Sequence, residues 1–132
     1  MTDCRAQDTA TTIGHPEQQF GRTMEIVKDL GVGRCMDVAA VRDRLYVIGS
    51  GKLHVLDITQ SHSPELLGTL TNLGHTRQIE VQNDVAYITA REDGVFIVDV
   101  SNSAKPRLLS HYNAIELATG IAISGKVAFV AC

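Results

Sequence analysis

The chain repeats itself with a period of about forty-two residues, and this repeat restricts the fold more than any other feature of the sequence. Asp57 and Asp99 lie 42 positions apart, and Pro64 and Pro106 are separated by the same 42 positions. Similar residues surround both pairs, so the two pairs mark copies of one unit. Repeats of this length are typical of solenoids and propellers, in which each copy is one supersecondary unit that needs its neighbours.

Each copy predicts four short antiparallel strands. The segments 36–50, 77–91 and 119–132 begin with alternating apolar residues, turn at a polar dipeptide and continue into an apolar run with one aromatic residue, as hairpins do. The aliphatic runs over 53–58 and 95–100 predict a third strand, and they do not alternate cleanly, which indicates burial on both faces. A fourth strand is expected after the proline. A four-stranded antiparallel unit with neighbours on both faces is a propeller blade.

The predicted fold class is therefore all-β, an incomplete β-propeller of four-stranded antiparallel blades. A helix over 23–31 is the alternative to a strand at the start of this region. Propellers close with four to eight blades, so this part of a ring would expose open blade edges, through which self-association is expected. The expected organisation is a flexible polar tail (1–22) and a partial β-propeller (23–132) that comprises an outer strand (24–30), a blade (36–72), a blade (77–113) and a half blade (119–132).

Three segments of the sequence resemble the LVIVD-repeat family of bacterial and archaeal β-propellers. They are FIVDVSNSAKP (96–106), VLDITQSHSPELLG (55–68) and NDVAYITAREDG (83–94), and the resemblance covers roughly residues 24–132. It implies a propeller fold, and it implies an exported or cell-surface protein because members of the family often occur there. A WD-repeat protein is the nearest rival, since Gly74-His75 fits its pattern, but the chain contains no tryptophan.

The recurring residues Asp57 and Asp99 end the aliphatic runs and have two alternative roles. As a ring of carboxylates for acid–base or metal chemistry, they would need partners within hydrogen-bond reach. As turn residues, they would accept hydrogen bonds from the backbone N–H groups that follow them. Because the aspartate recurs in each copy, with Pro64 and Pro106 after it, the structural turn is favoured. No catalytic residue is predicted.

Polar loop residues near the innermost strands are the candidate binding surface. Loops on a rigid scaffold commonly carry function, and these loops are expected on one face of a propeller. A solvated loop surface without a ligand is the alternative. The expected rim of the site consists of Arg34, His75, Arg77, Arg91, Glu92 and Asp93.

Composition and charge exclude several classes of partner. The net charge is -3 with acidic and basic residues intermixed, so neither nucleic acid nor an anionic membrane surface is an expected partner. Membrane insertion is not expected, because no apolar run approaches the roughly 18 residues of a span. The visible N-terminus carries no secretion signal, which favours the cytoplasm by default, whereas the resemblance points outside the cell; the localisation stays open.

Histidines and cysteines show no spacing typical of a metal site. The five histidines include no HxH or HxxxH pair, and the three cysteines include no CxxC pair. Motifs for a phosphate-binding loop or an activated serine are also missing from the sequence. Neither a metal nor a cofactor is predicted.

The leading functional hypothesis is a non-catalytic interaction scaffold that binds a protein or a glycan through its loop face. The alternative is a fragment of a propeller enzyme, a hydrolase or a lyase, whose active-site residues lie in blades outside this chain. The fold itself does not decide between these two hypotheses, because one fold supports many activities.

Overall fold

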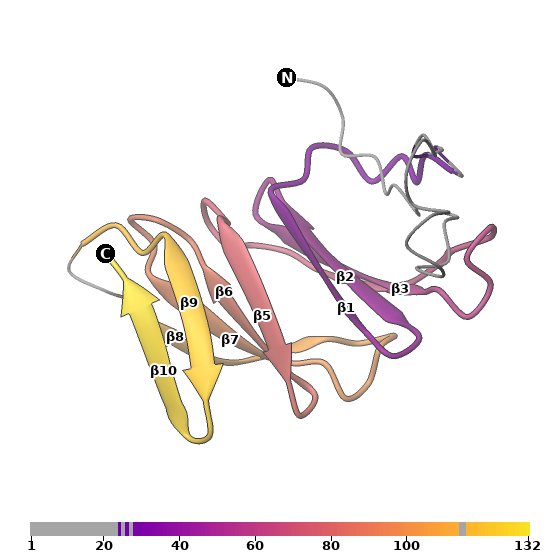
Figure 1. Cartoon of the computed structure of the whole chain (residues 1–132). Coiled ribbons are helices and arrows are strands. Elements are labelled where there is room, and N and C mark those ends of the chain that lie inside the picture. The colour runs from indigo at the N-terminus through magenta and orange to yellow at the C-terminus, as the bar shows by residue number, and fades with distance from the viewer. Residues whose placement is uncertain (1–23, 25, 27, 114–115) are drawn as a thin grey trace, which may run out of the picture.

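The computed structural model describes residues 24, 26, 28–113 and 116–132, and the predicted polar tail over 1–22 lies outside these residues. Within the described residues, ten strands form three antiparallel sheets with the orders β1-β2-β3-β4, β5-β6-β7-β8 and β10-β9 (Figure 1). In the described part of the chain no helix is long and apolar enough to span a membrane. The strands are β1 (Asp37–Val41), β2 (Arg44–Gly49), β3 (Lys52–Asp57), β4 (Glu65–Leu70), β5 (Gln78–Gln82), β6 (Val85–Thr89), β7 (Val95–Asp99), β8 (Arg107–Tyr112), β9 (Gly120–Ser124) and β10 (Val127–Ala131).

The first two sheets are four-stranded meanders with equivalent geometry, which confirms the prediction of an all-β chain with four-stranded antiparallel sheets. Tight polar turns join the first two strands of each sheet. Arg42 in the first turn and Asn83 and Asp84 in the second have positive φ values of 55°, 52° and 60°. Asparagine and aspartate tolerate this left-handed conformation better than other non-glycine residues. The third and fourth strands of both sheets also share a register shift, between Val55 and Leu56 and between Ile97 and Val98.

Aliphatic residues on facing surfaces hold the first two sheets together. The core between them includes Ile48 and Leu53 from the first sheet and Ile88 and Val98 from the second, all of them fully buried. A smaller cluster around Val95, Ala118 and Ile121 joins the second sheet to the β9–β10 hairpin. Burying a side chain of this size contributes about 1.5–3 kcal/mol. The aliphatic run of β7 is therefore buried on both faces, because the second sheet lies between the first sheet and the β9–β10 hairpin.

The inner strands of successive sheets lie side by side, and equivalent polar side chains link them. β1 contacts β5, and β5 contacts β9 (Figure 1). Asp37, the first residue of β1, accepts a 3.0 Å hydrogen bond from the backbone N–H of Ile79 in β5. Gln78, the first residue of β5, accepts a 3.0 Å hydrogen bond from the backbone N–H of Ile121 in β9. The same position of each repeat thus sets the register of the next sheet.

Two predictions concern the ends of the sheet array. The predicted outer strand over 24–30 lies partly outside the described residues; Ile26 forms an isolated bridge, residues 28–30 have no regular secondary structure, and the strand stays a prediction. At the other end, β10 pairs with β9 alone among the described strands, and Val127 and Phe129 on it are 53% and 61% exposed. Self-association through this edge also stays a prediction.

Candidate functional site

The strand register places the loops of the first two sheets at two opposite ends. Arg44 pairs with Asp57 and Val85 pairs with Asp99, so the third strands end beside the first hairpin turns. We call this the hairpin end; it comprises 41–44, 58–64, 81–84 and 100–106. The opposite end, which we call the His75 end, comprises 34–36, 50–51, 74–77 and 90–94.

At the hairpin end, Asp57 and Asp99 adopt the geometry of Asx turns. Asp57 Oδ1 accepts a 2.8 Å hydrogen bond from the N–H of Thr59. Asp99 Oδ1 accepts hydrogen bonds from the N–H and the hydroxyl of Ser101, at 2.9 and 2.6 Å. Such bonds stop a strand because they satisfy the first donors of the following loop. Pro64 and Pro106 stand directly before the fourth strands β4 and β8, where a missing N–H is tolerated.

These turns make stability depend on pH. Hydrogen bonds from the Ser101 side chain and backbone, assisted by Arg107, hold the pKa of Asp99 below its ordinary value of 3.8. Since the folded pKa is lower than the unfolded one, the stabilisation is fully present above the unfolded pKa and is lost as the pH falls through the folded pKa.

We therefore expect Asp99→Asn, which keeps the Oδ1 acceptor but removes the charge, to be less stable than the wild type at neutral pH. Thermal unfolding of both proteins between neutral and acidic pH measures the difference, which should shrink as the pH falls below 3.8. Asp99→Ala is the comparison that also removes the acceptor and should cost more at every pH. A difference between wild type and Asp99→Asn that stays constant over this range would contradict this explanation.

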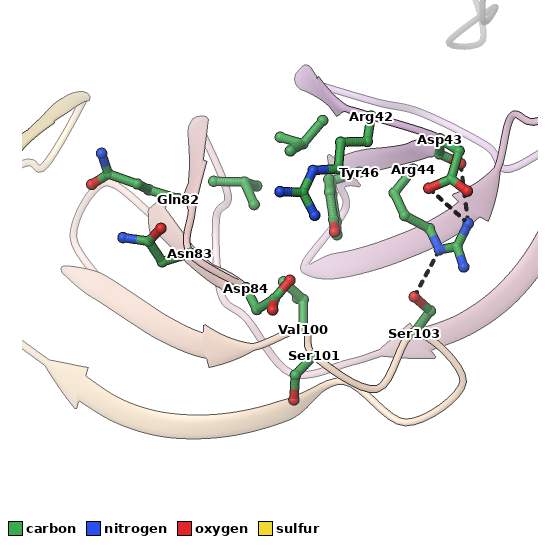
Figure 2. A pocket seen from close by; sticks show the side chains of 12 residues that line it. Arg42, Asp43, Arg44, Tyr46, Gln82, Asn83, Asp84, Val100, Ser101 and Ser103 are labelled. Carbon is green, nitrogen blue, oxygen red and sulfur yellow. Dashed lines mark hydrogen bonds and ion pairs between the residues drawn. The ribbon is translucent and has the colours of Figure 1, made fainter.

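A cavity of about 600 Å³ opens at the hairpin end between the first and second sheets. Its size is within the usual range of ligand sites in proteins. Figure 2 shows Arg42 and Tyr46 in the middle of the cavity, Gln82 and Asn83 on one side, and Arg44 on the other. The complete lining is Val41, Arg42, Asp43, Arg44, Tyr46, Val81, Gln82, Asn83, Asp84, Val100, Ser101 and Ser103.

Arg44 holds the two walls of this cavity together. Its Nε donates a 3.0 Å hydrogen bond to Ser103 Oγ in the β7–β8 loop of the second sheet. Its Nη1 lies 3.3 Å from Asp43 Oδ1 and 3.4 Å from Asp57 Oδ2 in the first sheet (the contacts to Ser103 and Asp43 are drawn in Figure 2). Because a guanidinium presents several donors in a fixed plane, one side chain can join these groups at once.

The electrostatics of the cavity are balanced. Two arginines, Arg42 and Arg44, face two aspartates, Asp43 and Asp84, so the charged residues of the lining sum to zero. Burial raises the pKa of Tyr46; the negative charges of Asp84 and Asp43 act in the same direction, and Arg44 opposes them. The phenol therefore remains a neutral hydroxyl near neutral pH. The lining as a whole offers hydroxyl, amide, carboxylate and guanidinium groups beside three valines.

At the opposite end, the structure brings together three of the residues expected there. His75 Nδ1 lies 2.6 Å from Glu92 Oε1 and 3.4 Å from Asp93 Oδ2, and the N–H of His75 donates a 2.9 Å hydrogen bond to Asp93 Oδ2. Arg91 belongs to the same β6–β7 turn and forms a β-bridge with Ala118. His75 comes just before β5, and Glu92 and Asp93 lie in the β6–β7 turn. The pairing of β5 with β6 therefore brings together residues that are far apart in the sequence.

The two remaining arginines of the expected rim lie shortly before the inner strands β1 and β5. Arg77 precedes β5 and donates its N–H to Thr89 O at 2.7 Å. Arg34 lies before β1, and its carbonyl packs directly against Gly49. Both residues are exposed. Arg34 belongs to the first sheet and the histidine cluster to the second, so the six expected residues are spread over two sheets.

Sequence reasoning missed the cavity at the hairpin end. The polar dipeptides Arg42-Asp43 and Asn83-Asp84 were recognisable, but they predict only turns. The signal for a site is that these dipeptides fall at the same position of consecutive repeats, since adjacent sheets then place them on opposite walls of one opening.

Comparison with known families identifies a known repeat that covers the second sheet. Residues 73–114 match the family model of the LVIVD repeat. The chain carries an LVIVD repeat. This LVIVD repeat includes all four strands from β5 to β8 and the turn formed by Asp99, and it confirms the resemblance read from the sequence. This match and the two equivalent four-stranded sheets support a β-propeller-type repeat domain. No protein with a curated description matched the chain.

Proposed function

We propose that this repeat domain is a non-catalytic binding module whose ligand is a neutral carbohydrate, held in the cavity at the hairpin end. The cavity between the two sheets is the observation that carries the proposal. It is formed by residues on two sheets that a buried core holds in place, so its walls are preorganised. Binding to a preorganised site avoids part of the cost of ordering loops.

The chemistry of the lining favours a carbohydrate over a peptide or a charged ligand. A sugar ring presents hydroxyl groups that donate and accept hydrogen bonds, and it also presents apolar C–H faces. Gln82, Asn83 and Asp84 supply amide and carboxylate groups for the hydroxyls, while Val81 and Val100 supply apolar surface. The balanced charge offers no net attraction to a phosphorylated or strongly acidic ligand.

A glycan array of neutral oligosaccharides tests the proposal, followed by calorimetry with the saccharides that bind. Asn83→Gly removes the amide but keeps the turn, because glycine accepts the positive φ of 52° at this position without strain. We expect this substitution to weaken binding about tenfold, equivalent to about 1.4 kcal/mol. The matched control is Asn72→Gly, since Asn72 is an exposed asparagine with a φ of 63° that lies outside the cavity; its binding should equal that of the wild type.

Two results would contradict the proposal. One is an array on which no saccharide binds while a peptide library yields ligands, which would indicate a protein partner. The other is loss of binding in Arg91→Gly with full binding in Asn83→Gly, because Arg91 has a comparable φ of 50° but lies at the His75 end.

A further inference from the structure

We propose that His75, Glu92 and Asp93 bind a divalent transition-metal ion at the end of the sheets opposite the cavity. One imidazole nitrogen and one oxygen of each carboxylate lie within 4.8 Å of one another. An imidazole with two carboxylates is a ligand set that suits Zn²⁺, with water completing the coordination. The inference is independent of the proposed carbohydrate site.

One of the two distances from the imidazole matches the value that a metal requires, and the other is less than 1 Å shorter. Zn²⁺ binds nitrogen and oxygen ligands at about 2.0–2.1 Å, so two ligands of a tetrahedral site lie roughly 3.3–3.4 Å apart. The 3.4 Å between His75 Nδ1 and Asp93 Oδ2 already has this value. The 2.6 Å between His75 Nδ1 and Glu92 Oε1 is a hydrogen-bond distance, and it has to lengthen by less than 1 Å. Glu92 is 53% exposed, so its side chain is able to make this adjustment.

The fold fixes the Asp93 carboxylate before any metal arrives. The N–H of His75 donates to Asp93 Oδ2, which holds the carboxylate beside the imidazole. Gly74 provides the room for it, because a Cβ at Gly74 would lie only 2.3 Å from Asp93 Oδ2. The carbonyl of Asp93 is itself bound by His111 Nε2, whose ring stacks on Phe96 with a centroid distance of 4.0 Å. Ligand orientation by surrounding groups of this kind strengthens metal sites.

The cluster is a feature of one repeat only, unlike the Asx turns. In the first sheet the residue equivalent to His75 is Arg34, and the second turn consists of Ser50 and Gly51, without a carboxylate. A device that the sheet needs for folding would be present in both copies. His75 is also 72% exposed, and exposed ion pairs add little to stability. Ion pairing with the imidazole therefore adds little to stability and does not explain why two carboxylates surround it.

Calorimetric titration of the full chain with Zn²⁺, Mn²⁺ and Ca²⁺ tests the site. All measurements use a Cys132→Ser background, because Cys132 is an exposed thiol that would bind zinc by itself. We expect one Zn²⁺ per chain, weaker binding of Mn²⁺ in accordance with the general order of metal affinities, and Ca²⁺ binding weaker still, since calcium prefers oxygen ligands.

Two substitutions and one control decide the outcome. His75→Gln and Glu92→Gln each remove a ligand at an exposed position and should weaken Zn²⁺ binding about 100-fold or more, beyond the 10–100-fold typical of groups that only support a ligand. His62→Gln changes another exposed histidine and should leave binding unchanged. Zn²⁺ should also raise the melting temperature of the wild type but not of His75→Gln. Equal Zn²⁺ affinity in His75→Gln and the wild type, or equal affinity of the wild type for Ca²⁺ and Zn²⁺, would overturn the proposal.

Discussion

Replacing Gly68 by alanine is expected to lower the free energy of unfolding by about 3 kcal/mol, the upper part of the usual range for overpacking. Gly68 lies in β4 at the register shift of the first sheet, and the second sheet approaches it closely. A Cβ at this position would be 2.3 Å from the carbonyl oxygen of Ser103 and 2.7 Å from that of Ala104. Both obstacles are backbone atoms, which a side-chain rotation does not remove.

The loop that would have to move is held by its own hydrogen bonds. The side chain of Asn102 accepts a 3.1 Å hydrogen bond from the N–H of Ala104. The backbone carbonyl of Asn102 accepts a 3.0 Å hydrogen bond from the N–H of Lys105. Arg44 anchors the same loop through Ser103, so a shift would also open the cavity wall. The expected effect is therefore a partial separation of the two sheets at the hairpin end.

Urea denaturation of the wild type and of Gly68→Ala measures this effect. Gly120→Ala is the matched control, because the atom nearest to its added Cβ is the side-chain atom Gln78 Oε1 at 3.2 Å, which has to move by only a few tenths of an ångström. The control should lose much less stability than Gly68→Ala. Equal stability of Gly68→Ala and the wild type would show that the two sheets do not pack as closely as described.

Replacing Leu53 by alanine should have an effect of similar size, about 2–5 kcal/mol, for a different reason. Leu53 in β3 is fully buried and belongs to the core between the first two sheets. Its strand neighbours are Ile48 and Leu70. Removal of its side chain leaves a cavity that surrounding strands fill only in part, and the lost contacts add to the lost burial.

Leu66→Ala provides the matched control, because the same atoms are removed from a leucine of the same sheet that is 51% exposed. Its loss of stability should be below about 1 kcal/mol, as for most surface substitutions. Chemical denaturation of both variants gives the comparison. Similar losses in Leu53→Ala and Leu66→Ala would mean that the two sheets do not share a core.

The strands were predictable because their signals are local. Alternating apolar residues, polar dipeptides and the prolines before the fourth strands are read within a few residues, and the repeat presents each signal at least twice. The hydrogen bond between Ser101 and Asp99 is local as well, since the two residues are two positions apart. Local hydrogen bonds of this kind depend little on the rest of the fold.

The two proposed sites were predictable only in part, because each depends on the strand register. His75, Glu92 and Asp93 were expected on one polar rim, but no metal was expected there. His75 meets Glu92 and Asp93 only after β5 and β6 have paired, and spacing rules for metal motifs detect ligands that are close in sequence. The cavity depends on how two separate sheets face each other, which Arg44 and Gly68 help to determine. No pattern within one repeat contains that information.

The central claim is that the cavity at the hairpin end binds a carbohydrate. Its most direct test is an NMR titration of the isotope-labelled chain, which follows the amide chemical shifts as a saccharide selected on the glycan array is added. The proposed carbohydrate site predicts that the largest shift changes fall on Asn83, Asp84 and Ser101, around the cavity between the two sheets. These changes should be absent in Asn83→Gly at the same saccharide concentration. Shift changes concentrated instead around His75 and Glu92 would contradict the claim.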